Sequence, residues 1–336
     1  MQNGLYKDVF FSQNLKKINE SQFDVSWWYR TTFSHLQNLR KQTLFFEGIN
    51  YKANVWLNGK QIGSSSQVVG AMRNFQFGLD SLQKENALAV QVFKPIDHTF
   101  PPDNNSTDLA ISFIDWSPHP PDFSMGIFRR VLLRSSYEGF TIDFPLVSTF
   151  LSRNNSVATL DIMAEISNSF GVNDTVPVNV TCNIYFLEGN RFSENASLSF
   201  SNEFPFSGKS INVWFNSSQF ASLVLQNAES KLWWPWQMGK QTMHKLEMKV
   251  SVKGEESDSL QTLFGIRQVT SSLTASQYRV FKVNGKNILI RGAGWAPDLF
   301  LVFNLFFTFC GVISKQCGFF GGREQTGQYK RFTSNM

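Results

Sequence analysis

Cysteine is scarce in this sequence of 336 residues, which contains only Cys182, Cys310 and Cys317. An odd and low count argues against a disulfide framework, and no cysteine is spaced from a histidine as in a zinc site. We therefore predict no metal site and no cofactor. Cys182 lies within the apolar run VTCNIYFL, which predicts a buried free thiol.

The chain also lacks a strong excess of charge of one sign. It has 31 Lys and Arg against 26 Asp and Glu, a net charge of +5, and the basic residues are scattered apart from small groups such as Arg129 and Arg130. Binding of nucleic acid would need basic residues clustered on one face. Nucleic acid is therefore excluded as an expected partner.

Long apolar runs are missing too. The longest, residues 299–313, is shorter than the about 20 residues that cross a bilayer, and Asn304 and Thr308 interrupt it. We predict no membrane span and no membrane partner. Residues 1–17 do not follow the basic, apolar and small-residue order of a secretory signal peptide.

Asn-X-Ser/Thr sequons, in contrast, are frequent. They begin at Asn19, Asn104, Asn105, Asn154, Asn173, Asn179, Asn195 and Asn216. A chain rich in Asn and Ser yields several by chance, so they give only weak support for a secretory history.

Helical periodicity is nearly absent from the first 270 residues, and short apolar runs separated by turns take its place. Hydrophobic residues make up 42% of the chain and aromatic residues 15%, enough for packed cores. Residues 52–64 predict a hairpin, because Asn58-Gly59 suits a type I′ turn. Regularly spaced strands of this kind predict an all-β chain built from β-sandwiches.

The rhythm of the strands changes near Glu138, which separates two sets. Strands before it form the first predicted domain, residues 1–138, and the segment 139–268, about 130 residues, has the length of an immunoglobulin-like sandwich. Residues 269–301 then predict a hairpin around Asn284-Gly285, a strand and a glycine-rich turn. That segment is too short to form a core of its own.

Three motifs together resemble glycoside hydrolase family 2. ANVWLNGKQIG (residues 53–63) resembles its galactose-binding-like jelly-roll domain, and KLWWPWQMGKQTMHKLEMKV (231–250) followed by FGIRQV resembles the end of its immunoglobulin-like domain. VFKVNGKNILIRGAGWAPDLF (280–300) resembles the first strand of its catalytic (β/α)₈ barrel. Their order and spacing also match the family, over residues 1–301.

Within the family, two loops resemble the exo-β-D-glucosaminidases more than the β-mannosidases or the mannosylglycoprotein endo-β-mannosidases. These are DWSPHPPDFSMGIFRRV (residues 115–131) and GAGWAPDLFL (292–301). The resemblance implies a retaining glycosidase of carbohydrate catabolism with an oligosaccharide substrate. Its two Glu carboxyls would lie roughly 5–5.5 Å apart, deep in the barrel.

The resemblance stops at Leu301, before any barrel. A barrel needs roughly 250 residues, whereas 35 residues follow Leu301, with Glu324 as their one acidic residue. We expect no catalytic residue in this chain and no activity from it alone.

Residues 302–336 are interpreted as a divergent tail from a retained intron or a wrongly assigned exon, because a Val302 codon begins with GT and the tail is rich in Phe. A short isoform or a tail that packs as a helix remain alternatives. The jelly roll is also expected to be incomplete at its N-terminus.

Five residues are candidates for lining a sugar subsite in the complete enzyme. Asp115, Trp116 and Asp122 lie on a loop that the family places over the barrel mouth, where an indole stacks on a pyranose and a carboxylate pairs with a glucosamine ammonium. Trp295 and Asp298 follow the first barrel strand, at the end where barrel active sites form. The alternative for each is a purely structural role.

Two further groups carry weaker functional interpretations. The cluster Trp233, Trp234, Pro235 and Trp236 could be a carbohydrate platform, although a packed corner is favoured. The histidines have no triad or ligand spacing and are interpreted as surface or loop residues; they are His35, His98, His119 and His244.

The alternative from another class is a non-catalytic β-sandwich protein that binds carbohydrate. For the glycosidase, the resemblance implies the secretory pathway, with a lysosomal or extracellular destination.

Overall fold

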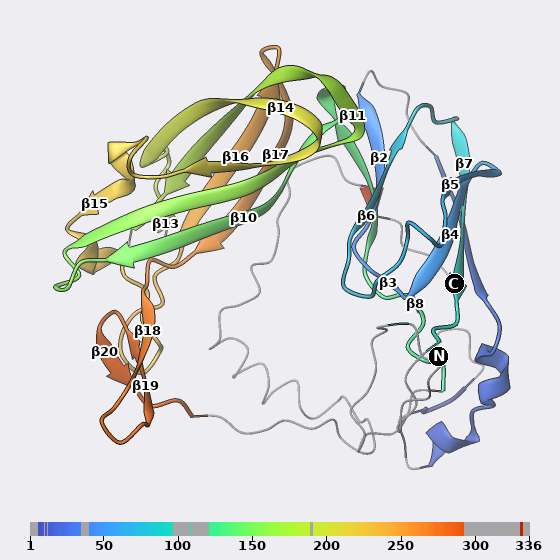
Figure 1. The fold of residues 1–336 in the computed structure, drawn as a ribbon, viewed down its shortest axis with the longest axis horizontal. Helices are drawn as coiled ribbons and strands as arrows, with labels where there is room; N and C mark the ends of the chain where they lie inside the picture. Colours follow the sequence, from blue (N-terminus) through green and yellow to red (C-terminus); the bar gives the residue numbers. More distant parts are fainter. Residues whose placement is uncertain are drawn as a thin grey trace. The chain divides into compact units, whose positions relative to one another are not determined.

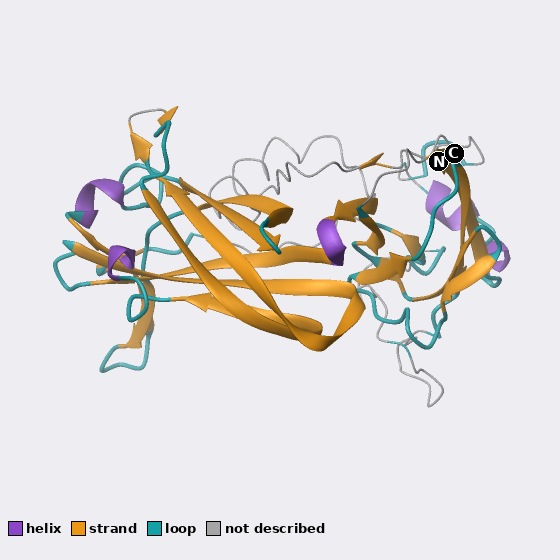
Figure 2. Cartoon of the chain, turned by 90° about the horizontal axis from the view of Figure 1, so that it is seen from above, coloured by secondary structure: helices purple, strands orange, loops and turns teal. Residues whose placement is uncertain are grey.

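The computed structural model describes residues 6–9, 11, 13–34, 40–96, 108, 121–188, 191–291 and 330–331. The chain divides into two compact units, each described by itself. Among the described residues, the first contains those up to Ser135 together with residues 330–331, and the second contains residues 136–188 and 191–291. Strands make up nearly all of the regular structure (Figure 2), which confirms the all-β prediction.

The first unit is a β-sandwich (Figure 1). One sheet has the order β1-β7-β4-β5, another has the order β21-β9-β2-β6, and β3 pairs with β8. Its elements are η1 (Asn14–Lys17), η2 (Glu20–Phe23), β1 (Trp27–Ser34), β2 (Lys41–Phe46), β3 (Ile49–Asn50), β4 (Lys52–Leu57), β5 (Lys60–Gly63), β6 (Phe75–Leu79), β7 (Glu85–Phe93), β8 (Gly126–Ile127), β9 (Val131–Ser136) and β21 (Lys330–Arg331).

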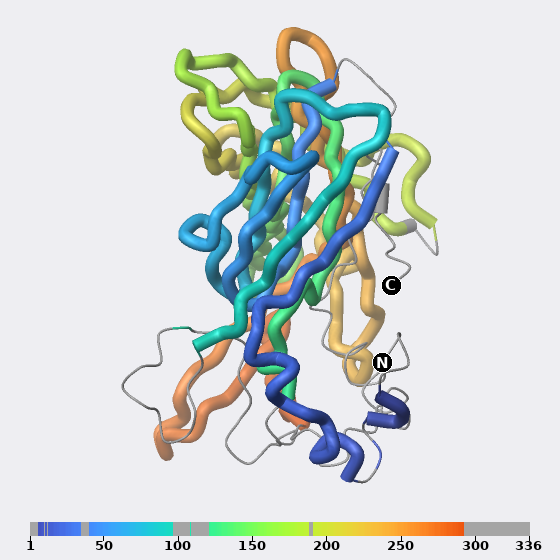
Figure 3. The backbone as a smooth tube through the Cα atoms, turned by 90° about the vertical axis from the view of Figure 1, so that its right-hand side faces the viewer, coloured from blue at the N-terminus to red at the C-terminus, as the bar shows by residue number. Residues whose placement is uncertain are grey.

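Alternation along the strands builds the core of this sandwich. Every second residue of β4 and β7 is buried, as expected for strands with one face on a core. The antiparallel strands β1, β7 and β4 lie side by side (Figure 3). Their inward residues, among them Phe33, Val55 and Val90, pack with Leu44 and Phe46 of β2.

The predicted hairpin of residues 52–64 is confirmed. Strands β4 and β5 are joined by Asn58 and Gly59, which both have positive φ, 51° and 81°. This is the backbone that a type I′ turn requires. The Asn58 side chain also donates to Asn86 Oδ1 at 2.9 Å, which ties the turn to the start of β7.

The second unit is a sandwich of longer strands followed by a small sheet. Its elements are η3 (Tyr137–Gly139), β10 (Phe140–Leu151), β11 (Val157–Tyr185), β12 (Leu187–Glu188), β13 (Arg191–Phe192), β14 (Leu198–Phe215), η4 (Ala221–Leu223), β15 (Val224–Gln226), η5 (Ala228–Lys231), β16 (His244–Val252), β17 (Glu255–Phe264), β18 (Val269–Leu273), β19 (Arg279–Val283) and β20 (Lys286–Ile288).

Strand β11 is continuous over 29 residues. Its first half pairs with β10 and with the second half of β14, and its second half pairs with the first half of β14 and with β16. The register shifts near Val172, which faces Gly208, and Gly171 and Gly208 both have positive φ. Such irregularities let strands bend from one sheet into another without ending. The two curved strands are seen in Figure 1.

The last sheet of the second unit has the order β18-β19-β20. Its β19–β20 turn at Asn284 and Gly285 has φ values of 49° and 79°, so the second predicted hairpin is confirmed. Strand β20 ends at Ile288, and the described residues contain no barrel. The assignment of β20 and its continuation to a first barrel strand stays a prediction, as do the exact domain boundaries and the interpretation of residues 302–336.

Candidate functional site

Asp122 is the one predicted site residue that the structure describes. Asp115, Trp116, Trp295 and Asp298 lie outside the described residues. The described chain resumes at Pro121, within the predicted loop, and Asp122 lies four residues before β8. Its neighbourhood therefore defines the base of that loop.

A tight turn holds the Asp122 backbone. Met125 N donates to Asp122 O at 3.0 Å, and Ser124 N donates to Asp122 Oδ1 at 3.0 Å. Asn50, which is fully buried on β3, donates from Nδ2 to Ser124 O at 2.8 Å. The turn is thus fixed to the sandwich, while the Asp122 side chain itself is exposed.

Tyr29 of β1 lies beside this turn. An ideal Cβ on Gly126 would lie 2.6 Å from the Tyr29 hydroxyl oxygen, and Gly126 has a φ of 142°, so only glycine fits there. Burial, and then the nearby Asp122 carboxylate, raise the pKa of Tyr29. The phenol therefore stays neutral and can donate a hydrogen bond.

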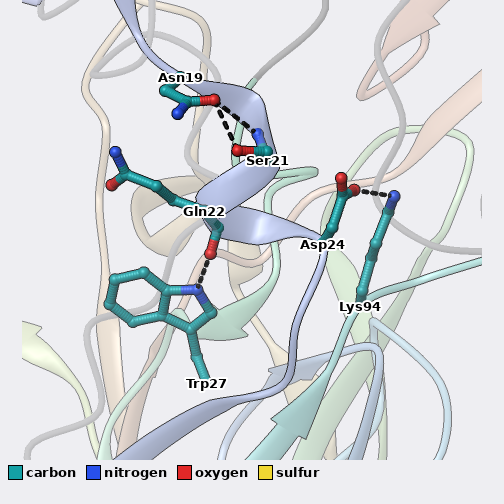
Figure 4. Close-up of polar contacts among 6 residues, drawn as sticks. All are labelled: Asn19, Ser21, Gln22, Asp24, Trp27 and Lys94. Atoms are coloured by element: carbon teal, nitrogen blue, oxygen red, sulfur yellow. Dashed lines mark hydrogen bonds and ion pairs between the residues drawn. The ribbon is translucent and has the colours of Figure 1, made fainter.

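A cation completes the loop base. Lys94 Nζ lies 2.6 Å from Asp24 Oδ1 and 4.1 Å from the centre of the Phe123 ring. Figure 4 shows this ion pair and, separately, the hydrogen bond that the Trp27 indole nitrogen donates to Gln22 O. The arrangement gives a fixed carboxylate, a neutral phenol and a cation that is already paired. It can bind polar groups.

The tryptophan cluster of the second unit is a packed corner. The Arg267 guanidinium lies 4.4 Å from the centre of the Trp233 ring, and Lys286 Nζ lies 4.9 Å from that of Trp234. Asn284 is 2% exposed and donates from Nδ2 to Trp233 O at 3.0 Å. Because cations cover both rings, the corner interpretation fits better than a carbohydrate platform, although Trp236 is exposed.

Sequence reasoning missed an aromatic pair in the first unit. Trp28 of β1 and Trp56 of β4 lie on opposite sides of β7, and their rings stack with centres 5.1 Å apart. Trp28 is 57% exposed. The only signal in the sequence was that alternation along each strand places both side chains on the face opposite the core. Their contact depends on the pairing of β1, β7 and β4, which the sequence does not show.

One histidine prediction is wrong. His244 is fully buried rather than at the surface, because it begins β16 between Phe186 and Phe264. Its Nε2 lies 2.9 Å from Lys231 O, and its Nδ1 accepts from Leu187 N at 3.3 Å. Burial lowers its pKa.

The prediction for Cys182 is confirmed, since this thiol is free and buried, and burial raises its pKa.

The described part of the chain offers neither a metal cluster nor a membrane-spanning helix. No group of three or more His, Cys, Asp or Glu side chains among the described residues is placed to hold a metal ion. No helix in the same residues is long and apolar enough to cross a bilayer.

Comparison with known families identifies both sandwiches. Residues 1–129 match the family model described as glycosyl hydrolase 2 galactose-binding domain-like, and residues 149–267 match that of glycosyl hydrolases family 2. The chain therefore belongs to glycoside hydrolase family 2, and its sandwiches are the galactose-binding-like and immunoglobulin-like domains of that family.

The relatives are glycosidases. The chain is 32% identical to the exo-β-D-glucosaminidase of Amycolatopsis orientalis over 90% of this chain and 27% of that protein. It is 28% identical to the mannosylglycoprotein endo-β-mannosidase of Lilium longiflorum over 88% of this chain and 32% of that protein. The crystal structure of the A. orientalis exo-chitosanase matches with a TM-score of 0.71 and 32% identity, over 90% of this chain and 33% of that one. A complex of that exo-chitosanase with PNP-β-D-glucosamine matches with a TM-score of 0.69. The chain spans 27% to 33% of the length of these relatives.

Proposed function

We propose that this chain supplies the two β-sandwich domains of a retaining β-glycosidase, of the exo-β-D-glucosaminidase type, that hydrolyses O-glycosyl bonds in carbohydrate catabolism. The observation that carries the proposal is the similarity to the A. orientalis exo-β-D-glucosaminidase, which extends over 90% of the chain. The substrate would be an oligosaccharide with a terminal β-linked glucosamine.

In this proposal Asp122 binds the substrate rather than reacting with it. Its carboxylate is exposed on a turn fixed by Asn50, and a charge-assisted hydrogen bond to a glucosamine ammonium would hold the sugar in place. Neutral Tyr29 adds a donor without adding negative charge. Asp115, Trp116, Trp295 and Asp298 are proposed to line the same subsite.

The two catalytic Glu residues are proposed to come from a barrel beyond this chain. The sheet β18-β19-β20 supports this view, because it exposes apolar side chains with no core of its own. They are Val269 and Leu273 of β18, together with Tyr278 directly before β19 and Leu289 and Ile290 directly after β20, each more than half exposed. Exposed apolar groups of this kind mark a contact surface.

Two measurements test the proposal. The chain alone, incubated with PNP-β-D-glucosamine, should release no more aglycone than a heat-killed control. Sequencing the transcript across the Val302 codon should reveal messages that join Leu301 to a long reading frame with a barrel and its two Glu codons. Activity of the chain alone, or messages that all end after Met336, would contradict the proposal.

A mannose-specific enzyme is the nearest alternative, because the Lilium relative is an endo-β-mannosidase. The complete protein distinguishes the two: hydrolysis of an aryl β-D-mannoside in preference to the β-D-glucosaminide would favour that alternative. A β-mannoside has no ammonium for Asp122 to bind.

A non-catalytic carbohydrate-binding role is a second candidate, favoured by the Trp28–Trp56 pair. The stack stands on an exposed sheet face beside an amide network, in which Asn54 Nδ2 donates to Gln91 at 3.2 Å and Gln61 donates to Asn54 at 3.3 Å. Indole faces and amides suit the apolar face and hydroxyls of a pyranose. Calorimetry with chitohexaose tests this role: Trp28→Ala should abolish binding, whereas Trp236→Ala, an exposed tryptophan elsewhere, should not.

We also propose that the protein follows the secretory pathway to a lysosomal or extracellular site. The frequency of sequons supports this proposal, and fractionation of its own cells followed by immunoblotting tests it.

A further inference from the structure

Three of the sequons form the same local turn. At Asn19, which precedes η2, the side-chain oxygen Oδ1 accepts from Ser21 N at 3.1 Å and from Ser21 Oγ at 2.7 Å. Figure 4 shows both bonds, with the Asn19 nitrogen Nδ2 on the other side of the carboxamide. The third residue of the sequon is thus bound to its first.

The same pair of bonds recurs in two turns of the second unit. Asn154, between β10 and β11, accepts from Ser156 N at 3.2 Å and from Ser156 Oγ at 2.8 Å. Asn216, directly after β14, accepts from Ser218 N at 3.1 Å and from Ser218 Oγ at 2.5 Å. In all three sequons the carboxamide uses Oδ1 and makes no described contact through Nδ2.

The other described sequons differ in their surroundings. Asn173 and Asn179 lie within the long strand β11, where Asn179 is paired on both sides, with Glu203 of β14 and Ser251 of β16. Asn195 lies in a loop, but the hydroxyl of its Ser197 accepts from Phe186 N and contacts Ser193 Oγ. These three sequons therefore form a comparison set within the same chain.

We propose that Asn19, Asn154 and Asn216 are N-glycosylation sites of this protein. The turns involve only neighbouring residues, so they can form whether or not the sandwiches have folded. Asn19 and Asn154 are exposed and Asn216 is partly exposed. A glycan on Nδ2 would leave the Oδ1 bonds of each turn intact and would project into solvent from a turn or strand end, where no ladder is interrupted.

The donor must be a lipid-linked pyrophosphate oligosaccharide, the class of molecule used by the transferase of the endoplasmic reticulum. Nδ2 forms a bond to C1 of the first sugar, and the bond between C1 and the pyrophosphate oxygen breaks. The lipid pyrophosphate leaves with the bonding electron pair, and Nδ2 gives up one proton to a base of the transferase. No oxidation or reduction occurs.

The proposal does not depend on the glycosidase reaction, so the two can fail separately. The first experiment uses the protein purified from its own cells with an antibody against this chain. It is treated with peptide N-glycosidase in heavy-oxygen water, which converts each glycosylated Asn to a labelled Asp, and its peptides are analysed by mass spectrometry. We expect label at positions 19, 154 and 216.

Variants assign the sites in the full chain, directed into the endoplasmic reticulum of a eukaryotic cell by a cleavable leader. Ser21→Ala, Ser156→Ala and Ser218→Ala should each remove one step of electrophoretic mobility, and Ser→Thr at the same positions should keep it. Ser152→Ala is a matched control, because Ser152 Oγ donates to Asn154 Oδ1 at 2.8 Å but lies outside the sequon. It should leave the pattern unchanged.

Electrophoretic mobility of the variants is measured in whole-cell extracts, so that a variant that misfolds and is not secreted still gives a result. Absence of label at any of the three positions in the native protein would overturn that site. Label confined to Asn173, Asn179 or Asn195 would overturn the proposal as a whole.

Discussion

Trp233, Trp234 and His244 of the second unit are packed against other side chains, whereas Asp122 and Trp28 of the first unit are exposed to solvent. In the second unit, Trp233 and Trp234 are covered by Arg267 and Lys286, and His244 is sealed between two phenylalanines. In the first, the Asp122 carboxylate is exposed on an anchored turn, and Trp28 stands on an open sheet face. Tryptophan therefore contributes to packing at Trp233 and Trp234 in the second unit and to a candidate binding surface at Trp28 in the first.

The largest expected effect tests the packing of the second unit. Phe215 is fully buried and its ring contacts the rings of Phe200, Phe204 and Phe220. Phe215→Ala should lower the free energy of unfolding by about 3–5 kcal/mol, since it removes a large side chain from a closed core. Urea unfolding followed by circular dichroism measures this. Trp214→Ala, one residue away and half exposed, should cost much less, and equal losses would contradict the comparison.

The next effect tests the binding role of the first unit. Asp122→Asn keeps the shape of the turn and removes its charge. In the complete enzyme this change should weaken binding of a glucosaminide by about 1.5–3 kcal/mol, the range for a hydrogen bond to a charged group, seen as a raised KM. Asp24→Asn is the control, because Asp24 is already paired with Lys94. An unchanged KM would remove Asp122 from the subsite.

The third prediction concerns the close approach of Gly126 to Tyr29 beside the Asp122 turn. Gly126→Ala would place a methyl group 2.6 Å from the Tyr29 hydroxyl oxygen at a φ of 142°. We expect a loss of about 1–3 kcal/mol of stability from this strained position. Combining it with Tyr29→Phe should recover the part due to the hydroxyl contact, and the double-mutant cycle separates it from backbone strain. Full recovery would show that φ contributes nothing.

Because His244 is buried, we expect the stability of the second unit to depend on pH. Its folded pKa is lowered, so the unfolded chain binds a proton more readily. This contribution is fully present above the ordinary His pKa near 6.5 and is lost as the pH falls from there toward the folded pKa. One group changes stability by at most about 1.4 kcal/mol per pH unit. The free energy of unfolding measured between pH 7.5 and 5 should fall less in His244→Phe than in the unchanged chain.

We expect the smallest losses of stability when a surface ion pair is broken, and each unit offers one such pair. Asp24→Asn breaks the pair with Lys94, and Glu256→Gln weakens the pair with Lys249, whose atoms lie 3.2 Å apart. Each should cost less than about 1 kcal/mol and less again at high salt, because these groups are largely solvated. A larger loss for Asp24→Asn would show that Lys94 holds the Phe123 turn as well as the carboxylate.

Much of the fold could be predicted because its signals are local. The turns at Asn58-Gly59 and Asn284-Gly285 need positive φ at two adjacent positions, and these residues tolerate it. Strands β4 and β5 were predicted as the hairpin of residues 52–64, and Cys182 as part of an apolar run. The candidate site could be predicted less well: the motif pointed to Asp122, but nothing local pointed to Tyr29, Asn50 or Lys94 beside it.

By itself the sequence determined the hairpin turns, the all-β class and the motifs of the family, because each depends on residues a few positions apart. The tertiary structure decided the burial of His244, the continuity of β11 and the stacking of Trp28 on Trp56 across β7. It also decided that Asn284, placed at a turn by its backbone, uses its side chain to hold the Trp233 corner. These features depend on strand pairing over long sequence separations, and the energy of such contacts exists only once the pairing has formed.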